Sequence, residues 1–162
     1  MTKRNQSLMI GHGAVVLLMG LLMGFGFIFS LIGEISLWPV PGHWPFEMPG
    51  NERAWRAAHI GNILNGVMAM AGGICLPYAR LKAGAEKFVT WSFIIAIWGN
   101  FGFYVFSALG ATGRGLTFGP NKFGGGDVLS ILTFLVAYPG AVLLPIAVFM
   151  IARGAFAAAR EG

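Results

Sequence analysis

The residue with the clearest capacity for chemistry is His59, which stands near the start of a long apolar segment and is followed by Asn62 and Asn65. Imidazole and amide groups are costly in hydrocarbon unless they are paired, so polar residues in such a segment are candidates for a functional site. Neutral imidazole is a common donor to metals and to haem iron. We therefore take His59 as a candidate ligand for a metal or for haem iron.

Helical periodicity groups His59 with other residues of the same segment. If residues 56–78 form a helix, one face carries His59, Asn62, Gly66 and Gly73. Asn65 lies on a neighbouring face. The small residues after the histidine would leave room for a flat ligand beside the helix. They are also typical of two membrane helices that pack closely together, and the sequence leaves both interpretations open.

A second polar face is predicted for residues 88–109, where Asn100, Tyr104 and Ser107 follow one another at i, i+4 and i+7. Tyr104 offers a phenolic hydroxyl, and Asn100 offers both a donor and an acceptor. Aromatic neighbours could form apolar walls around a pocket here. Tyrosine can also serve as an anchor at the membrane interface, but its position well inside the apolar run favours the pocket.

Three further polar residues have less specific patterns. His12 lies between two glycines, which would allow a ligand or another backbone to approach, although a simple polar tether is the other interpretation. His43 lies in a proline-rich segment and is interpreted as a loop residue. Asp127 precedes an apolar run, where its carboxylate is predicted to cap the start of a helix.

The composition indicates a membrane protein. Of the 162 residues, 56% are hydrophobic and only 10% are charged, and the mean hydropathy is +0.72. Because about 20 apolar residues cross a bilayer as a helix, four spans are predicted, at about residues 8–33, 56–78, 88–109 and 128–152. The first is too long for the apolar part of a typical signal peptide and has no clear A-x-A site. The expected fold is therefore a single all-α domain of four transmembrane helices over residues 1–162.

The basic residues predict an orientation for these spans. One side of the membrane would hold Lys3, Arg4, Arg80, Lys82, Lys87, Arg153 and Arg160. The other side would hold Arg53, Arg56, Arg114 and Lys122. Because basic residues concentrate in cytoplasmic loops, this bias favours both termini in the cytoplasm. The net charge of +5 is scattered and forms no patch of the kind that binds nucleic acid.

Several chemistries lack their sequence signatures. There is no recognisable Ser/His/Asp set, no paired carboxylates within a span and no HExxH motif, and the single Cys75 excludes a CxxC site. Residues 110–126 are rich in glycine but match no phosphate-binding fingerprint, so we expect a folded lid or a re-entrant cap over a membrane pocket. The remaining imidazole, amide and phenol groups could hold a haem through one histidine and leave the other axial position open.

At several places the chain closely resembles the styrene oxide isomerase family, small integral-membrane enzymes of bacterial styrene breakdown. The matching motifs are Gly11-His12-Gly13, Ala58-His59, Leu64-Asn65-Gly66, Trp98, Asn100, Gly102-Phe103-Tyr104, Phe106-Ser107, Arg114-Gly115-Leu116-Thr117-Phe118-Gly119-Pro120-Asn121, Phe123-Gly124 and Gly126-Asp127. The string from Arg114 to Asn121 is the most specific, because helix packing alone would not dictate it.

The resemblance implies an enzyme that converts styrene oxide to phenylacetaldehyde in the inner membrane. It implies a homotrimer with haem b near the subunit interfaces and His59 as the axial ligand of ferric iron. It also implies that Asn65 and Tyr104 line the epoxide pocket, with Asn100 nearby. The iron would act as a Lewis acid on the epoxide oxygen, and a 1,2-hydride shift would give the aldehyde without net redox change.

The chain departs from the family at one position, and the sequence leaves two other functions open. Some family members have an acidic residue near the position of Ala96, where this chain has only apolar residues, so any role of that carboxylate does not carry over. A haem-binding electron carrier would require two axial ligands per haem and would show a bis-histidine spectrum. A non-enzymatic four-span scaffold or small transporter would bind no haem.

Overall fold

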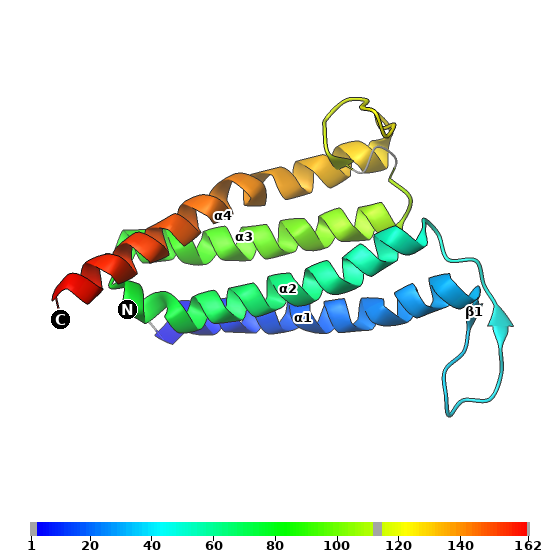
Figure 1. Cartoon of the computed structure of the whole chain (residues 1–162), viewed down its shortest axis with the longest axis horizontal. Coiled ribbons are helices and arrows are strands. Elements are labelled where there is room, and N and C mark those ends of the chain that lie inside the picture. Colours follow the sequence, from blue (N-terminus) through cyan, green and yellow to red (C-terminus); the bar gives the residue numbers. More distant parts are fainter. Residues whose placement is uncertain (1–2, 112–114, 162) are drawn as a thin grey trace.

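Four long helices run side by side in the computed structural model, which describes residues 3–111 and 115–161 (Figure 1). They are α1 (Lys3–Ile32), α2 (Glu52–Cys75), α3 (Ala83–Ala108) and α4 (Val128–Glu161). Each is long and apolar enough to cross a membrane. The two chain ends lie at one end of the molecule, and the two long connections lie at the other. The predicted all-helical architecture with four long helices is confirmed.

The helices extend beyond the apolar runs where local hydrogen bonds allow it. α2 begins at Glu52 because the side chain of Asn51 accepts a hydrogen bond from the backbone N–H of Ala54 at 3.0 Å. After Cys75 the chain tightens into a short 3₁₀ turn, η1 (Leu76–Ala79). The predicted cap of α4 is confirmed, since Asp127 Oδ1 accepts from the backbone N–H of Ser130 at 3.0 Å.

Glycines allow the helix backbones to approach closely in two pairs. Between α1 and α2, a Cβ atom on Gly20 would lie 2.6 Å from the backbone nitrogen of Ile63. Between α3 and α4, a Cβ atom on Gly140 would lie 2.6 Å from the Cα of Ala96. Real Cβ atoms do not lie this close to other heavy atoms, so both contacts require glycine. The molecule is thus built from an α1–α2 pair and an α3–α4 pair, joined where α2 meets α3.

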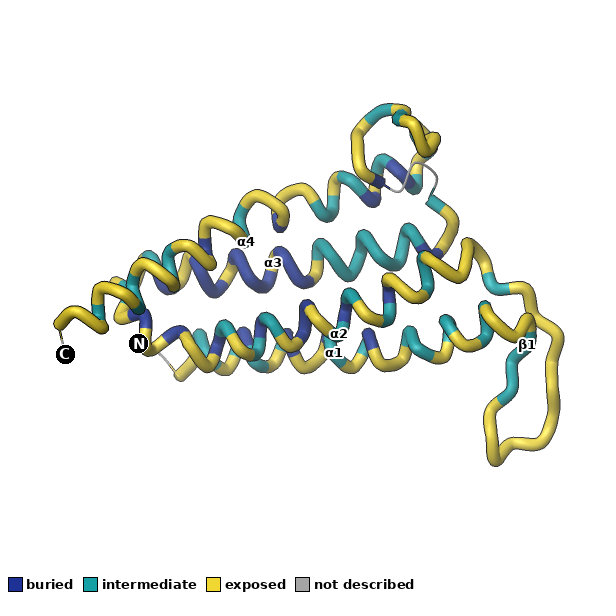
Figure 2. The backbone as a smooth tube through the Cα atoms, viewed as in Figure 1, coloured by how far each residue is buried: buried dark blue, intermediate teal, exposed yellow. Residues whose placement is uncertain are grey.

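The apolar core lies towards the end that holds the termini. Its buried members are Met9, Val16, Ala69, Leu76, Val89, Phe93, Ile97 and Ala147. Figure 2 shows that the buried positions follow the seams between helices, while much of α1 and α4 is exposed. Large apolar side chains dominate these exposed faces, for example Leu21, Leu22 and Phe149. Such faces fit lipid or a neighbouring subunit better than water.

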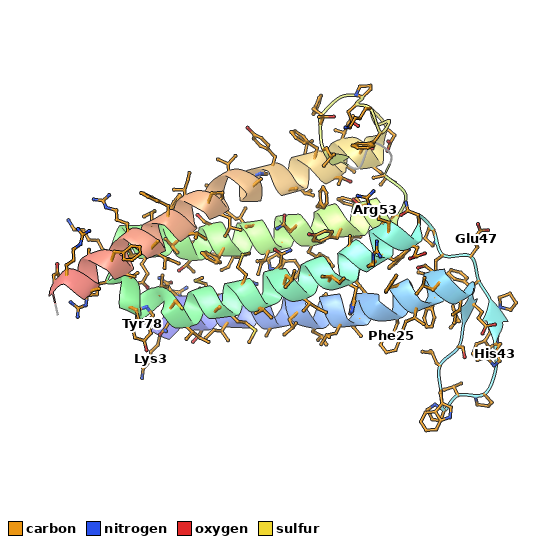
Figure 3. All side chains as sticks on the ribbon, in the orientation of Figure 1. Lys3, Phe25, His43, Glu47, Arg53 and Tyr78 are labelled. Carbon is orange, nitrogen blue, oxygen red and sulfur yellow. The ribbon has the colours of Figure 1, made fainter. Side chains whose placement is uncertain are left out.

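The first long connection projects from the far end of the bundle. It contains a minimal antiparallel pair, β1 (Glu34–Ile35) and β2 (Trp44–Pro45), in which Glu34 is opposite Pro45. His43 lies in this connection, as predicted, and its Nδ1 is 2.7 Å from the Oε1 of Glu34. Figure 3 shows His43 at the outer edge, away from Arg53 at the start of α2. His43 therefore contributes to the connection and not to the helical bundle.

Candidate functional site

The imidazole of His59 is fixed by α1. Its Nδ1 lies 2.8 Å from the carbonyl oxygen of Gly20. Because a carbonyl can only accept, Nδ1 carries the hydrogen, and in the neutral ring Nε2 then has the lone pair. Gly24 makes the approach possible, since a Cβ atom there would lie 3.0 Å from the ring. A histidine held by a backbone carbonyl through one nitrogen is oriented to ligate metal through the other.

The glycines that follow His59 on its helical face pack against α1. A Cβ atom on Gly66 would lie 2.6 Å from the carbonyl oxygen of Gly13, and one on Gly73 would lie 3.1 Å from the Cβ of Met9. α1 fills the space beside these two glycines, so a flat ligand does not fit there. Close helix packing is the correct one of the two interpretations at these positions.

Asn62, the remaining member of this face, is fully buried. Its Nδ2 donates to the carbonyl oxygen of Ala58 at 2.9 Å. Its Oδ1 has no hydrogen-bond partner among the described residues. The α1-facing side of α2 is therefore closed, apart from the edge where the His59 ring remains partly exposed.

The other polar face joins α2 to α3. Asn100 Nδ2 donates to Asn65 Oδ1 at 3.1 Å, and the Asn65 residue is only 8% exposed. One helical turn beyond Asn100, the ring of Tyr104 packs directly against Gly61 of α2. Three residues that sequence reasoning placed around one pocket, Asn65, Asn100 and Tyr104, thus lie along one seam.

A cavity of about 600 Å³ opens along this seam at the end opposite the termini. It is lined by Asn51, Arg53, Ala54, Ala57, Phe103, Tyr104, Ser107, Ala111 and Leu116. A second hollow, of about 330 Å³, shares Arg53, Ala57 and Tyr104 with it. Leu116 comes from the glycine-rich connection, which was expected to act as a lid over a pocket. Arg114, in the same connection, lies outside the described residues.

Sequence reasoning missed two polar residues of this cavity wall, Asn51 and Arg53. Asn51 is the cap of α2, and Arg53 lies in the first turn of that helix. Both precede the predicted apolar span, so hydropathy gave no reason to place them beside Tyr104. The cap residue followed by Glu52 was the available signal that the helix starts earlier.

His59 and Tyr104 are associated with opposite sides of α2. His59 contacts α1 at Gly20 and Gly24, whereas Tyr104 contacts α2 at Gly61. Positions 59 and 61 are separated by about 200° around a helix axis. A single copy of the chain therefore does not bring its own imidazole and phenol to the same side of α2.

Two other predicted positions have structural partners. His12 Nδ1 accepts a hydrogen bond from Trp98 Nε1 at 3.1 Å, which is a polar tether between α1 and α3. Ala96 is fully buried against Gly140 of α4. A larger side chain at position 96, an acidic one included, would collide with α4.

Comparison with known proteins identifies the family of this chain. The family described as styrene oxide isomerase matches residues 5–156. A protein of Pseudomonas fluorescens named styrene-oxide isomerase is 38% identical over 136 residues, which cover 83% of this chain and 79% of that relative. His59, the Asn65–Asn100 pair and the Tyr104 cavity all lie within the matched region. The chain belongs to the styrene oxide isomerase family.

Proposed function

We propose that this chain is a membrane-embedded isomerase that converts styrene oxide to phenylacetaldehyde. Its membership of the family and its 38% identity to a protein named styrene-oxide isomerase support this activity. The observation that carries the proposal is the geometry of His59, a histidine oriented by a backbone carbonyl of α1 at a partly exposed edge of α2. The same membership favours an isomerase over the electron carrier and the scaffold.

The residues present fit a haem b. A haem iron needs one protein donor at a minimum, because the porphyrin supplies four nitrogens, and His59 Nε2 is such a donor. Among the described residues, no group of three or more His, Cys, Asp or Glu could hold a free metal ion. When bound, ferric haem would supply a Lewis acid for the epoxide oxygen.

A homotrimer would complete the site. His59 and Tyr104 lie on opposite sides of α2, and the exposed apolar faces of the bundle are available for contact between subunits. In the proposed assembly, the seam of one subunit faces the His59 edge of its neighbour. The four spans would lie in a bacterial inner membrane with both termini in the cytoplasm.

Tyr104, Asn65 and Asn100 bind and orient the substrate in this proposal. The Tyr104 hydroxyl donates to the epoxide oxygen, and the two amides fix the position of the ring that opens. The apolar wall, which includes Phe103, Ala57 and Leu116, excludes water and so prevents hydrolysis to the diol. The benzylic C–O bond opens, and one hydride moves from the terminal carbon to the benzylic carbon. The product is an isomer of the substrate, so no electron donor is consumed.

The test is substitution of the proposed ligand. His59→Ala is expected to lose both the haem Soret band and the formation of phenylacetaldehyde from styrene oxide. His43→Ala is the matched control, since His43 lies in the outer connection, and it is expected to keep both. Full haem content and turnover in His59→Ala would overturn the ligand assignment. Wild-type protein that is colourless and free of iron, yet makes aldehyde, would overturn the haem proposal.

A further inference from the structure

Ser107 has a buried hydroxyl whose hydrogen-bonding capacity is unused. Its Oγ has no partner among the described residues, although the atom is shielded from solvent. A serine inside a helix can donate to the carbonyl four residues earlier, and Ser92 of the same helix does so, to Phe88 at 2.8 Å. An unsatisfied buried hydroxyl costs about 1–3 kcal/mol. Its presence therefore needs an explanation other than stability.

The position of Ser107 supplies that explanation. It lines the cavity of about 600 Å³ together with Tyr104, which lies three residues earlier in α3. Residues at i and i+3 are neighbours on a helix surface, so the two hydroxyl-bearing side chains border the cavity from adjacent turns. Ala111 and Leu116 line the same cavity from the glycine-rich connection. The hydroxyl is shielded from solvent in the fold described here, so a rotation about the Cα–Cβ bond of Ser107 would present it to a ligand in this cavity.

We propose that Ser107 is a positioning residue that donates a hydrogen bond to the oxygen of a small apolar epoxide bound in this cavity. This inference rests on the proposed function and adds a donor to it. The ligand class follows from the lining, which combines apolar walls with a few neutral polar groups. The acceptor oxygen of the ligand satisfies the hydroxyl that the folded protein leaves unpaired.

The effect on stability distinguishes this role from a structural one. In Ser107→Ala, an unpaired buried group is removed, so the melting temperature is expected to stay the same or rise. The KM for styrene oxide is expected to rise about tenfold, because a typical net hydrogen bond is near that magnitude, while the Soret band is unchanged. Ser107→Thr keeps a hydroxyl and is expected to restore most of the binding.

Ser92→Ala is the matched control, because it removes a buried serine of α3 whose hydroxyl is already paired. It is expected to lower the melting temperature and to leave KM unchanged. If Ser107→Ala behaves in the same way, Ser107 is structural and the inference is overturned.

A binding measurement separates failure of this inference from failure of the proposed function. Styrene has the same aromatic ring as styrene oxide but lacks the oxygen. Wild-type protein is expected to bind styrene oxide more tightly than styrene, and Ser107→Ala is expected to lose that preference. If wild-type protein converts no styrene oxide, the proposed function fails, and the binding preference still decides the role of Ser107. Equal preference in wild type and Ser107→Ala would overturn the inference.

Discussion

The two sides of α2 meet their neighbours in contrasting ways. Towards α1 the contact is made by backbone against backbone, with Gly13 against Gly66 and Gly20 against Ile63. Towards α3 the contact is made by side chains, with Asn65 against Asn100 and the Tyr104 ring against Gly61. The first interface is closed, and the second contains the cavity of about 600 Å³.

This difference separates two tasks within one helix. The closed interface fixes the orientation of His59, because the carbonyl that holds its Nδ1 belongs to the tightly packed α1. The open interface keeps hydrogen-bonding groups and space where a ligand can enter. Tight packing would suit His59 in its proposed role as a ligand to iron, because it stops the ring from rotating, whereas a pocket requires empty space. Substitutions on the two sides of α2 should therefore fail in different ways.

The largest effect is expected from filling the closed interface. In Gly66→Leu the first added atom would lie 2.6 Å from both the carbonyl oxygen of Gly13 and the backbone nitrogen of Leu17, and neither can move independently. We expect the free energy of unfolding in detergent to fall by about 3 kcal/mol or more, with haem lost as a consequence. Gly11→Ala is the control, because nothing lies within 4 Å of a Cβ atom there. A stable Gly66→Leu protein would contradict the closed interface.

A smaller effect, confined to catalysis, is expected from the open interface. Tyr104→Phe keeps the ring against Gly61 and removes only the hydroxyl. We expect kcat for styrene oxide to fall by about 100-fold, as is typical when one hydrogen-bond donor to a developing oxyanion is removed. The Soret band and the melting temperature should be those of the wild type. Tyr138→Phe, at an exposed position of α4, is the control. Loss of haem in Tyr104→Phe would show that its role is misassigned.

The sequence was sufficient for features that depend on one helix at a time. The four spans follow from length and hydropathy, and the shared position of Tyr104 and Ser107 on one cavity wall follows from a period of 3.6 residues. It was not sufficient for features that depend on which helix is the neighbour. Gly66 and Gly73 are compatible with a ligand or with a helix beside them, and only the packing of α1 decides between the two.

The same limit applies to the candidate site. Helical periodicity placed Asn65 on a different face from His59, but it could not show that Tyr104 packs on the α2 side away from His59. The sequence also could not predict that the Ser107 hydroxyl lacks a hydrogen-bond partner. A serine in a helix can donate to the carbonyl four residues earlier, as Ser92 does, and nothing in the sequence distinguishes the two serines. Both facts depend on rotamers and on neighbours that are distant in the sequence.

The smallest predicted effect concerns the amide pair that joins α2 to α3. Asn65→Ala and Asn100→Ala each leave one amide without its partner, so each should lower the free energy of unfolding by about 1 kcal/mol. In a double-mutant cycle the pair should show a coupling energy of about 0.6 kcal/mol, the usual size for hydrogen bonds between membrane helices. Combining Asn65→Ala with Ser92→Ala is the control, and these two changes should be additive because Ser92 lies about 12 Å along α3 from Asn100.

Coupling in stability alone would make this pair a clamp between the two helices. Coupling that also appears in the KM for styrene oxide would place the bond at the ligand, as the open interface requires. Additive effects on both quantities would contradict the 3.1 Å hydrogen bond itself. The cycle therefore tests whether the substrate reaches the Asn65–Asn100 pair from the Tyr104 cavity. A hydrogen bond that only holds the two helices together is not expected to affect substrate binding.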